Sequence, residues 1–142
     1  MTDTFTKAER SRIMAAVKSK DTTPEMVVRR IVHGLGFRYR LHVRSLPGTP
    51  DLVFPRLRKV IDVRGCFWHM HGCRSCRIPT TRLTYWTRKL TGNTLRDRQN
   101  ARELRRSGWE VLTVWECQTK NDATRRLLLR LEHFLGGPRH ST

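Results

Sequence analysis

The sequence predicts one α/β domain in which helices flank a small, mixed sheet of four strands. Short apolar segments of strand length alternate with longer segments of helical periodicity, and glycine or proline separates them. The length of 142 residues suits one domain, without repeats, low-complexity tracts or a linker. We therefore expect a single domain over residues 1–142, with a flexible tail at 136–142.

Two helices are expected first. Thr6 and Glu9 have the spacing of a capping box, which predicts a helix that runs to about Lys20. A second helix begins at residues 23–25, where a proline suits the first helical position, and it ends near Gly36. Its apolar residues recur at helical spacing, which indicates that one face is buried.

Four strands and two further helices follow. Strands are expected at 37–43, 51–54, 59–63 and 110–115. A helical tract should cover 83–107 with an interruption near Gly92, and a last helix should cover 122–135. The segment 64–81 has no period and is rich in cysteine, histidine and glycine, so we expect an irregular loop there.

The charge indicates a polyanionic partner. Lysine and arginine number 29 against 12 acidic residues, which gives a formal charge of +17. Solubility alone rarely takes a small domain beyond a charge of about 8. A basic membrane-surface protein would need an amphipathic helix with a bulky apolar face, whereas these arginines are scattered from Arg10 to Arg139. Nucleic acid is therefore the favoured partner.

The sequence favours a cytoplasmic location. No stretch approaches the roughly 18 apolar residues that span a bilayer, so no membrane partner is expected. The first residues also lack the basic and then apolar order of a signal peptide.

Acidic residues on two neighbouring predicted strands suit magnesium chemistry. Asp51 follows Pro50 where a tight turn enters one strand, and the next strand ends in Asp62, Val63 and Arg64. Mg²⁺ binds one or two carboxylates together with water and phosphate oxygens, and it activates water for phosphodiester hydrolysis. On its own, an ordinary turn aspartate explains Asp51 equally well.

The densest motif contains residues that suit zinc. Three of the four cysteines fall within eleven residues beside several histidines, and the fourth is remote. Without a secretory signal, this pattern favours a metal site over disulfides. A closed tetrahedral zinc site needs four ligands, and composition leaves the choice open among Cys66, His69, His71, Cys73, Cys76 and Cys117.

Aromatic residues lie beside these ligands. Phe67 and Trp68 are adjacent in the loop, and Trp86 follows it. They either seal the metal site or stack in DNA, where the energy of opening a base step is offset by contacts with the opened site. Trp86 suits the core of a helix equally well.

These motifs occur together, and in the same order, in one known family. They are the turn Leu46–Asp51, the run Gly65–Trp68 with His69, His71 and Cys73, Trp86 with Lys89 and Asn93, the triplet Arg96–Arg98, and Gly108-Trp109 leading to Trp115–Cys117. The set resembles the very-short-patch-repair (Vsr) endonucleases. The resemblance covers roughly residues 5–120, most of the chain.

The resemblance implies a fold and an activity. The fold would have a restriction-endonuclease-like core, related to the PD-(D/E)xK nucleases. The enzyme would nick double-stranded DNA on the 5′ side of the thymine in a T·G mismatch, which arises when 5-methylcytosine deaminates. It would be a monomer with a functional link to a DNA cytosine-5 methyltransferase and to mismatch-repair proteins.

The resemblance also implies a magnesium site. Asp51 would be the central ligand, the backbone carbonyl of Val63 would be a second, and two Mg²⁺ ions would bind. Glu25 would hold metal-bound water, although an acidic residue also suits the first turn of a helix.

The same resemblance assigns the proton transfer to His69. An imidazole with a pKa of about 6.5 suits a general base at neutral pH. Asp97 would orient His69, and Asn93 would lie nearby.

Zinc and DNA contacts are implied in the same way. One structural zinc ion would be held by Cys66, His71, Cys73 and Cys117, and Cys76 would be an ordinary loop residue. The wedge that enters the mismatch from the major groove would be Phe67, Trp68 and Trp86. The helix over residues 1–20 would close over the minor groove with Arg10, Arg12, Met14 and Lys18, unless it is simply a basic solvated helix.

Two positions depart from the family pattern. Members usually carry aspartate or histidine at the position of Arg64, and an apolar residue at the position of Asp62. Residues two apart in a strand point to the same face. Either the acidic role has moved to Asp62 while Arg64 grips the scissile phosphate, or the two side chains form an ion pair of no catalytic consequence.

Two other functions stay open. A restriction or homing nuclease of the same fold would share Asp51 without needing a mismatch wedge. A zinc-dependent DNA-binding module without catalysis would explain the charge and the cysteines, but not the combination of Asp51, His69 and Asp97.

Overall fold

A computed structural model describes residues 21–73 and 81–136 of the chain. The expected N-terminal helix, with Arg10, Arg12, Met14 and Lys18, lies outside these ranges, as do Cys76 and residues 137–142 of the expected tail. Within the two described ranges, no helix is both long enough and apolar enough to cross a membrane.

A sheet of four strands forms the centre of the fold. The strands lie in the order β1 (Arg40–Leu41), β2 (Leu52–Phe54), β3 (Lys59–Arg64) and β4 (Glu110–Trp115). β2 pairs antiparallel with both β1 and β3, whereas β3 and β4 run parallel. The small mixed sheet predicted from the sequence is therefore confirmed.

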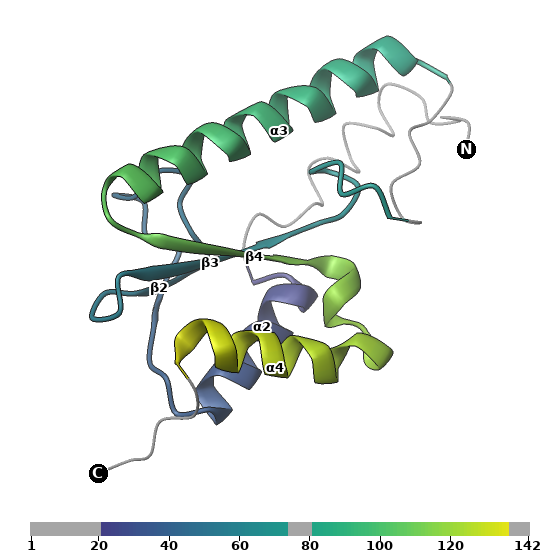
Figure 1. The fold of residues 1–142 in the computed structure, drawn as a ribbon. Helices are drawn as coiled ribbons and strands as arrows, with labels where there is room; N and C mark the ends of the chain where they lie inside the picture. Colours follow the sequence, from purple (N-terminus) through teal and green to yellow (C-terminus); the bar gives the residue numbers. More distant parts are fainter. Residues whose placement is uncertain (1–20, 74–80, 137–142) are drawn as a thin grey trace.

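Helices cover both faces of the sheet (Figure 1). α3 (Leu83–Arg106) lies along one face and provides the crossover that the parallel strands β3 and β4 require. α2 (Thr23–Gly34) and α4 (Thr124–Leu135) lie on the other face. Two short 3-10 turns, η1 (Glu116–Thr119) and η2 (Asn121–Ala123), connect β4 to α4.

Local sequence explains where α2 begins. The Thr22 hydroxyl accepts a hydrogen bond from the backbone N–H of Glu25 at 3.3 Å, which satisfies one of the free donors of the first turn. Pro24 also occupies the first turn, where its missing N–H is not needed. This position fixes Glu25 at the start of the helix, beneath the sheet.

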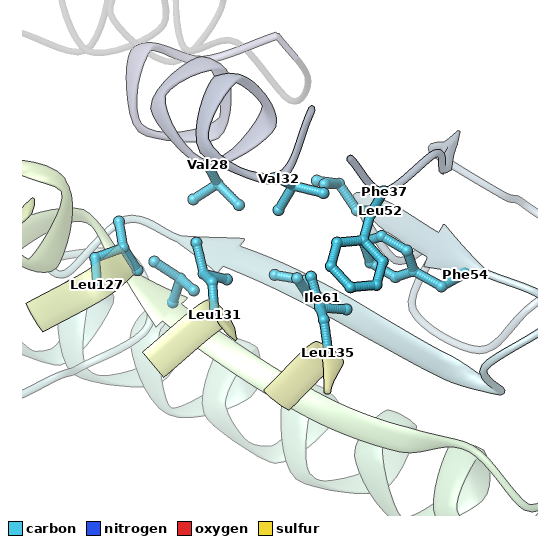
Figure 2. Packing of buried hydrophobic residues seen from close by; sticks show 10 residues of the cluster. Val28, Val32, Phe37, Leu52, Phe54, Ile61, Leu127, Leu131 and Leu135 are labelled. Carbon is cyan, nitrogen blue, oxygen red and sulfur yellow. The ribbon is translucent and has the colours of Figure 1, made fainter. Parts of the chain in front are cut away.

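The main core fills the space between the sheet and the helices α2 and α4 (Figure 2). Alternate strand residues point into it, because successive side chains of a strand lie on opposite faces. Its buried residues are Val28, Val32, Phe37, Leu52, Phe54, Ile61, Val114, Leu127, Leu131 and Leu135.

The opposite face of the sheet is apolar only at one end. Val53 and Val60 pack there against Leu104 and Trp109, close to the end of α3. The rest of this face carries Asp62 and Arg64 of β3, which alternate with core residues, and Asp51, which directly precedes β2. A polar site therefore lies between the sheet and α3.

Three expected boundaries were wrong. The strand expected at 37–43 is only two residues long, because His42 has a left-handed backbone (φ 47°) that ends the extended conformation. α3 continues through Gly92, since burial along its length offsets the roughly 1 kcal/mol helix penalty of one glycine. α4 begins at Thr124, after a 3-10 turn rather than at 122.

Candidate active site

A polar pocket of about 660 Å³ opens between the sheet and α3. The strand β3 and Asp51, which directly precedes β2, form its floor, and Asp97 and Asn100 of α3 line one wall. We call it the carboxylate pocket. Its charged or titratable lining residues include His42, Asp51, Asp62, Arg64, His69 and Asp97.

Strand register aligns three of these side chains in a row. One step beyond the paired residues Leu52 and Ile61, Asp51 lies opposite Asp62. The backbone N–H of His42 donates to the carbonyl of Asp51 at 3.0 Å, which extends the row onto the neighbouring strand. Two carboxylates that face each other across antiparallel strands repel, so this arrangement favours a cation between them.

Burial sets the charge state of Asp51. Its side chain is 16% exposed, and desolvation raises its pKa to about 7, aided by the nearby carboxylates of Asp62 and Glu25. A hydrogen bond at 2.7 Å from the backbone N–H of Val63 and the proximity of His42 act in the opposite direction. A bound cation would favour the ionised form of Asp51.

Glu25 reaches this row through His42. Both carboxylate oxygens of the buried Glu25 lie 3.0 Å from Nε2 of His42, which is itself 3.9 Å from Oδ1 of Asp51. Nη1 of Arg29 lies 3.3 Å from Oε2 of Glu25. Sequence reasoning missed His42, since the only signal for it is a strand register that no local pattern encodes.

His69 is held from α3. Its Nδ1 lies 2.5 Å from Oδ2 of Asp97, which leaves Nε2 as the ring nitrogen available for chemistry in the pocket. A histidine fixed by a carboxylate on one nitrogen has a defined tautomer and orientation. The structure therefore brings together the two residues that the family resemblance paired.

Asn93 of α3 hydrogen-bonds to the loop that carries His69. Its side-chain N–H donates to the backbone carbonyl of Trp68 at 2.8 Å, and its Oδ1 accepts from Arg96 at 2.6 Å. Asn93 therefore anchors the residue that precedes His69, close to the Asp97–His69 pair.

Arg64 lies between two acidic residues. Its guanidinium nitrogens are 3.5 Å from Oδ2 of Asp62 and 3.9 Å from Oδ2 of Asp97. The guanidinium carbon lies 6.0 Å from the ring centroid of Trp115. Burial raises the pKa of Asp62, and the charge of Arg64 partly counteracts this. The basic residue at position 64 is thus tied to the acidic residue at position 62.

A second group of ligand atoms lies just beyond the pocket. The sulfur and nitrogen atoms of Cys66, His71, Cys73 and Cys117 all lie within 4.8 Å of one another. We call these four residues the thiol cluster. Three come from the segment after β3, and the fourth follows β4, so the cluster joins the ends of two parallel strands.

The donor set of the thiol cluster fits zinc. Three sulfurs and one imidazole nitrogen give a complete tetrahedral set, which leaves no position for substrate. Burial raises the pKa of the Cys66 thiol to about 12, so a bound cation would be needed to hold it as a thiolate. The ring of His71 stacks on Trp115 at 4.3 Å, which fixes its orientation.

The three aromatic residues Phe67, Trp68 and Trp86 form one cluster. The ring centroid of Phe67 lies 5.1 Å from that of Trp68 and 5.6 Å from that of Trp86. Trp86 is 6% exposed, whereas Phe67 and Trp68 are half-buried. In this conformation Trp86 is part of the packing at the start of α3.

Comparison with known proteins identifies the relatives of this chain. The family model "DNA mismatch endonuclease Vsr" matches residues 2–75. The chain is 48% identical over 118 residues to the type II nicking enzyme V.XorIIP of Xanthomonas oryzae pv. oryzae, covering 83% of this chain and 87% of the relative. It is 39% identical over 140 residues to the DNA mismatch endonuclease Vsr of Escherichia coli, covering 96% and 90%. The type II nicking enzyme V.NmeAIP of Neisseria meningitidis is 42% identical over 123 residues, covering 87% and 88%.

Proposed function

This chain belongs to the Vsr family of DNA mismatch endonucleases, and from that membership we propose that it nicks one strand of duplex DNA on the 5′ side of the thymine in a T·G mismatch. The substrate would arise by deamination of 5-methylcytosine. We extend the proposal to the fold, which we assign to the restriction-endonuclease-like nucleases.

One observation carries the catalytic part of this proposal. The His69–Asp97 pair lines the same pocket as the facing carboxylates Asp51 and Asp62. A base on one wall and a cation site on the floor are the two components that metal-assisted phosphodiester hydrolysis requires. Neither component is explained by a module that only binds DNA.

We assign the magnesium site to the row across the sheet. Asp51 would be the central ligand, with the backbone carbonyl of Val63 and, in this chain, Asp62 as the second carboxylate. Glu25 would act through water. Two Mg²⁺ ions bound here would lower the pKa of the attacking water and neutralise charge on the leaving oxygen.

His69 would accept a proton from the attacking water at Nε2. Asp97 holds Nδ1, so the imidazolium formed by that transfer would be stabilised by an adjacent carboxylate. Arg64 would bind the scissile phosphate, since its guanidinium lines the pocket beside both acids. These roles explain why a basic residue is tolerated at position 64 once Asp62 supplies the acid.

DNA binding and zinc complete the proposal. The wedge would be formed by Phe67, Trp68 and Trp86, and the minor-groove arm would contain Arg10, Arg12, Met14 and Lys18. One structural zinc ion would occupy the thiol cluster. We propose a monomer in the cytoplasm, linked in function to a DNA cytosine-5 methyltransferase and to mismatch-repair proteins.

A nicking assay tests the function directly. A labelled duplex with one T·G mismatch is compared with matched C·G and T·A duplexes, with and without added Mg²⁺. We expect a single cut immediately 5′ of the mispaired thymine, only when Mg²⁺ is present. Omission of Mg²⁺ is preferable to a chelator, which would also strip zinc.

The variant Asp51→Ala should lose at least about 1,000-fold in nicking rate, because a metal site contributes several kcal/mol to the transition state. Glu110→Gln is the matched control, since that carboxylate is 69% exposed and lies outside the carboxylate pocket. Equal cutting of all duplexes would leave a nuclease without a repair role. Nicking by Asp51→Ala at the wild-type rate would refute the catalytic assignment.

A further inference from the structure

A second hollow, of about 620 Å³, adjoins the carboxylate pocket along α3. Its charged lining consists of one carboxylate, Asp97, and five arginines: Arg64, Arg98, Arg102, Arg105 and Arg106. We call this hollow the arginine groove. It continues the carboxylate pocket, because Arg64 and Asp97 line both.

The arginines form one row along the helix. Arg98, Arg102 and Arg106 follow one another at intervals of four, which places them on the same face of α3. The row runs from the residue next to Asp97 to the end of the helix. Eight residues of helix span about 12 Å, which corresponds to about three or four nucleotides at 3.4 Å each along one strand.

The charge of this row is not neutralised by the described part of the protein. Asp97 is committed to His69 and Arg64. Among residues 21–73 and 81–136, no ion pair includes Arg98, Arg102 or Arg106. Glu103, the acid next to Arg102 in the sequence, bonds instead to Gln99 at 3.4 Å. Exposed guanidinium groups that repel one another favour a polyanion in the groove.

Two of these arginines have another explanation. Arg105 and Arg106 lie in the last turn of α3, where basic side chains interact favourably with the helix dipole. This effect is confined to the last turn, so it does not account for Arg98 or Arg102. It also does not account for Arg64, which comes from β3.

We propose that the arginine groove binds backbone phosphates of the DNA strand where that strand leaves the carboxylate pocket. The ligand is the sugar–phosphate backbone rather than a base, because guanidinium groups recognise phosphate oxygens in any sequence. Arg64 is the first residue of this track. This proposal rests on the proposed function, since the position of the cut defines where the strand leaves the pocket.

The test compares two double variants with the same loss of charge. Arg102→Gln/Arg106→Gln removes the centre and end of the row. Arg125→Gln/Arg126→Gln removes two exposed arginines of α4, on the opposite face of the sheet (Figure 1). Affinity is measured against salt concentration on a duplex with one T·G mismatch and on its matched counterpart.

We expect the groove variant to lower the slope of log Kobs against log salt by about 1.8, since each lost phosphate contact removes about 0.9. The loss should be equal on both duplexes, because phosphate contacts carry no sequence information. The control variant should keep the wild-type slope. Equal slope changes in both variants, or none in the groove variant, would overturn the proposal.

Shortening the duplex tests the direction of the track. Removing base pairs stepwise from one arm should weaken wild-type binding on one side of the mismatch only, and the groove variant should be insensitive to that truncation. Identical arm-length dependence in wild type and groove variant would again overturn it. Thermal unfolding of all variants excludes a helix-stability effect.

The two proposals fail in different ways. If wild type does not nick the T·G duplex while the groove variant still shows the smaller slope, the proposed activity is wrong and the phosphate site stands. If wild type nicks as expected and both double variants bind alike, only the groove is refuted.

Discussion

The carboxylate pocket and the thiol cluster draw on the same short stretch of chain but use it in opposite ways. Asp62, Arg64 and His69 line the pocket, whereas Cys66, His71 and Cys73 belong to the cluster. The pocket is open, and two carboxylates, Asp51 and Asp62, face each other in it. The cluster brings together four possible ligand atoms, which is the number that a closed tetrahedral metal site needs.

The difference shows how a rigid part of the fold supports a strained one. Asp51 is buried opposite Asp62, and among the described residues no arginine or lysine forms an ion pair with it, so ionisation of Asp51 destabilises the metal-free pocket. Cys66, three residues before His69, and His71, two residues after it, both belong to the thiol cluster. A metal held there would fix the loop on both sides of His69.

The largest expected effect comes from breaking the thiol cluster. Cys73→Ser should lose the bound zinc and lower the Tm by about 10–20 °C, because a structural zinc contributes its binding free energy to folding. Elemental analysis and calorimetry measure the two quantities. Nicking should fall with the loss of the ordered loop.

Cys76→Ser is the matched control for this variant. It changes a thiol three residues away that the proposal leaves out of the metal site, so zinc content and Tm should stay at wild-type values. Loss of zinc from Cys76→Ser with retention in Cys73→Ser would show that the ligand set was assigned wrongly.

A smaller effect is expected from removing the buried carboxylate of Asp51. Burial raises the pKa of Asp51 to about 7, above an ordinary aspartate value of about 3.9. The folded state therefore binds the proton more tightly than the unfolded state, and this stabilisation is present below about pH 4 and lost as pH rises through about 7. Asp51→Asn, which keeps an acceptor for the N–H of Val63, avoids that loss.

In magnesium-free buffer, Asp51→Asn should gain about 4 kcal/mol relative to wild type between pH 4 and pH 8, since each pKa unit corresponds to about 1.4 kcal/mol. Urea unfolding at several pH values measures the difference. Mg²⁺ at pH 8 should stabilise wild type and leave the variant unchanged. A difference independent of pH would mean that Asp51 is not strained in the metal-free pocket.

The elements of the fold were largely predictable because local patterns encode them. Apolar periodicity and turn residues located β2, β3 and β4, and Pro24 together with apolar residues at helical spacing located α2. β1 was overestimated because the left-handed conformation of His42 depends on its neighbours in space. The same reasoning explains why Gly92 did not interrupt α3, whose buried side chains decide its length.

The site was predictable in composition but not in arrangement. The motifs named the ligand types of both regions, and the pairing of His69 with Asp97 followed from the family resemblance. His42 joins Glu25 to Asp51 only because three strands pair in one register. The arginine groove was hidden for a similar reason, since its members on α3 meet Arg64 only when β3 lies beneath the helix.

The smallest effect concerns the hydrogen bond that ties α3 to the loop between the two regions. Asn93→Ala removes the donor to the carbonyl of Trp68, which should reduce the free energy of unfolding by about 1 kcal/mol.

If the thiol cluster alone fixed the loop, nicking would be unaffected. Because Asn93 anchors the loop one residue before His69, we expect kcat to fall about tenfold while zinc content and KM stay unchanged. Gln99→Ala is the control, since that side chain on the same helix is exposed and bonds to the exposed Glu103, so its loss should change none of these quantities. A wild-type kcat for Asn93→Ala would assign the positioning of His69 to the metal ligands and Asp97 alone.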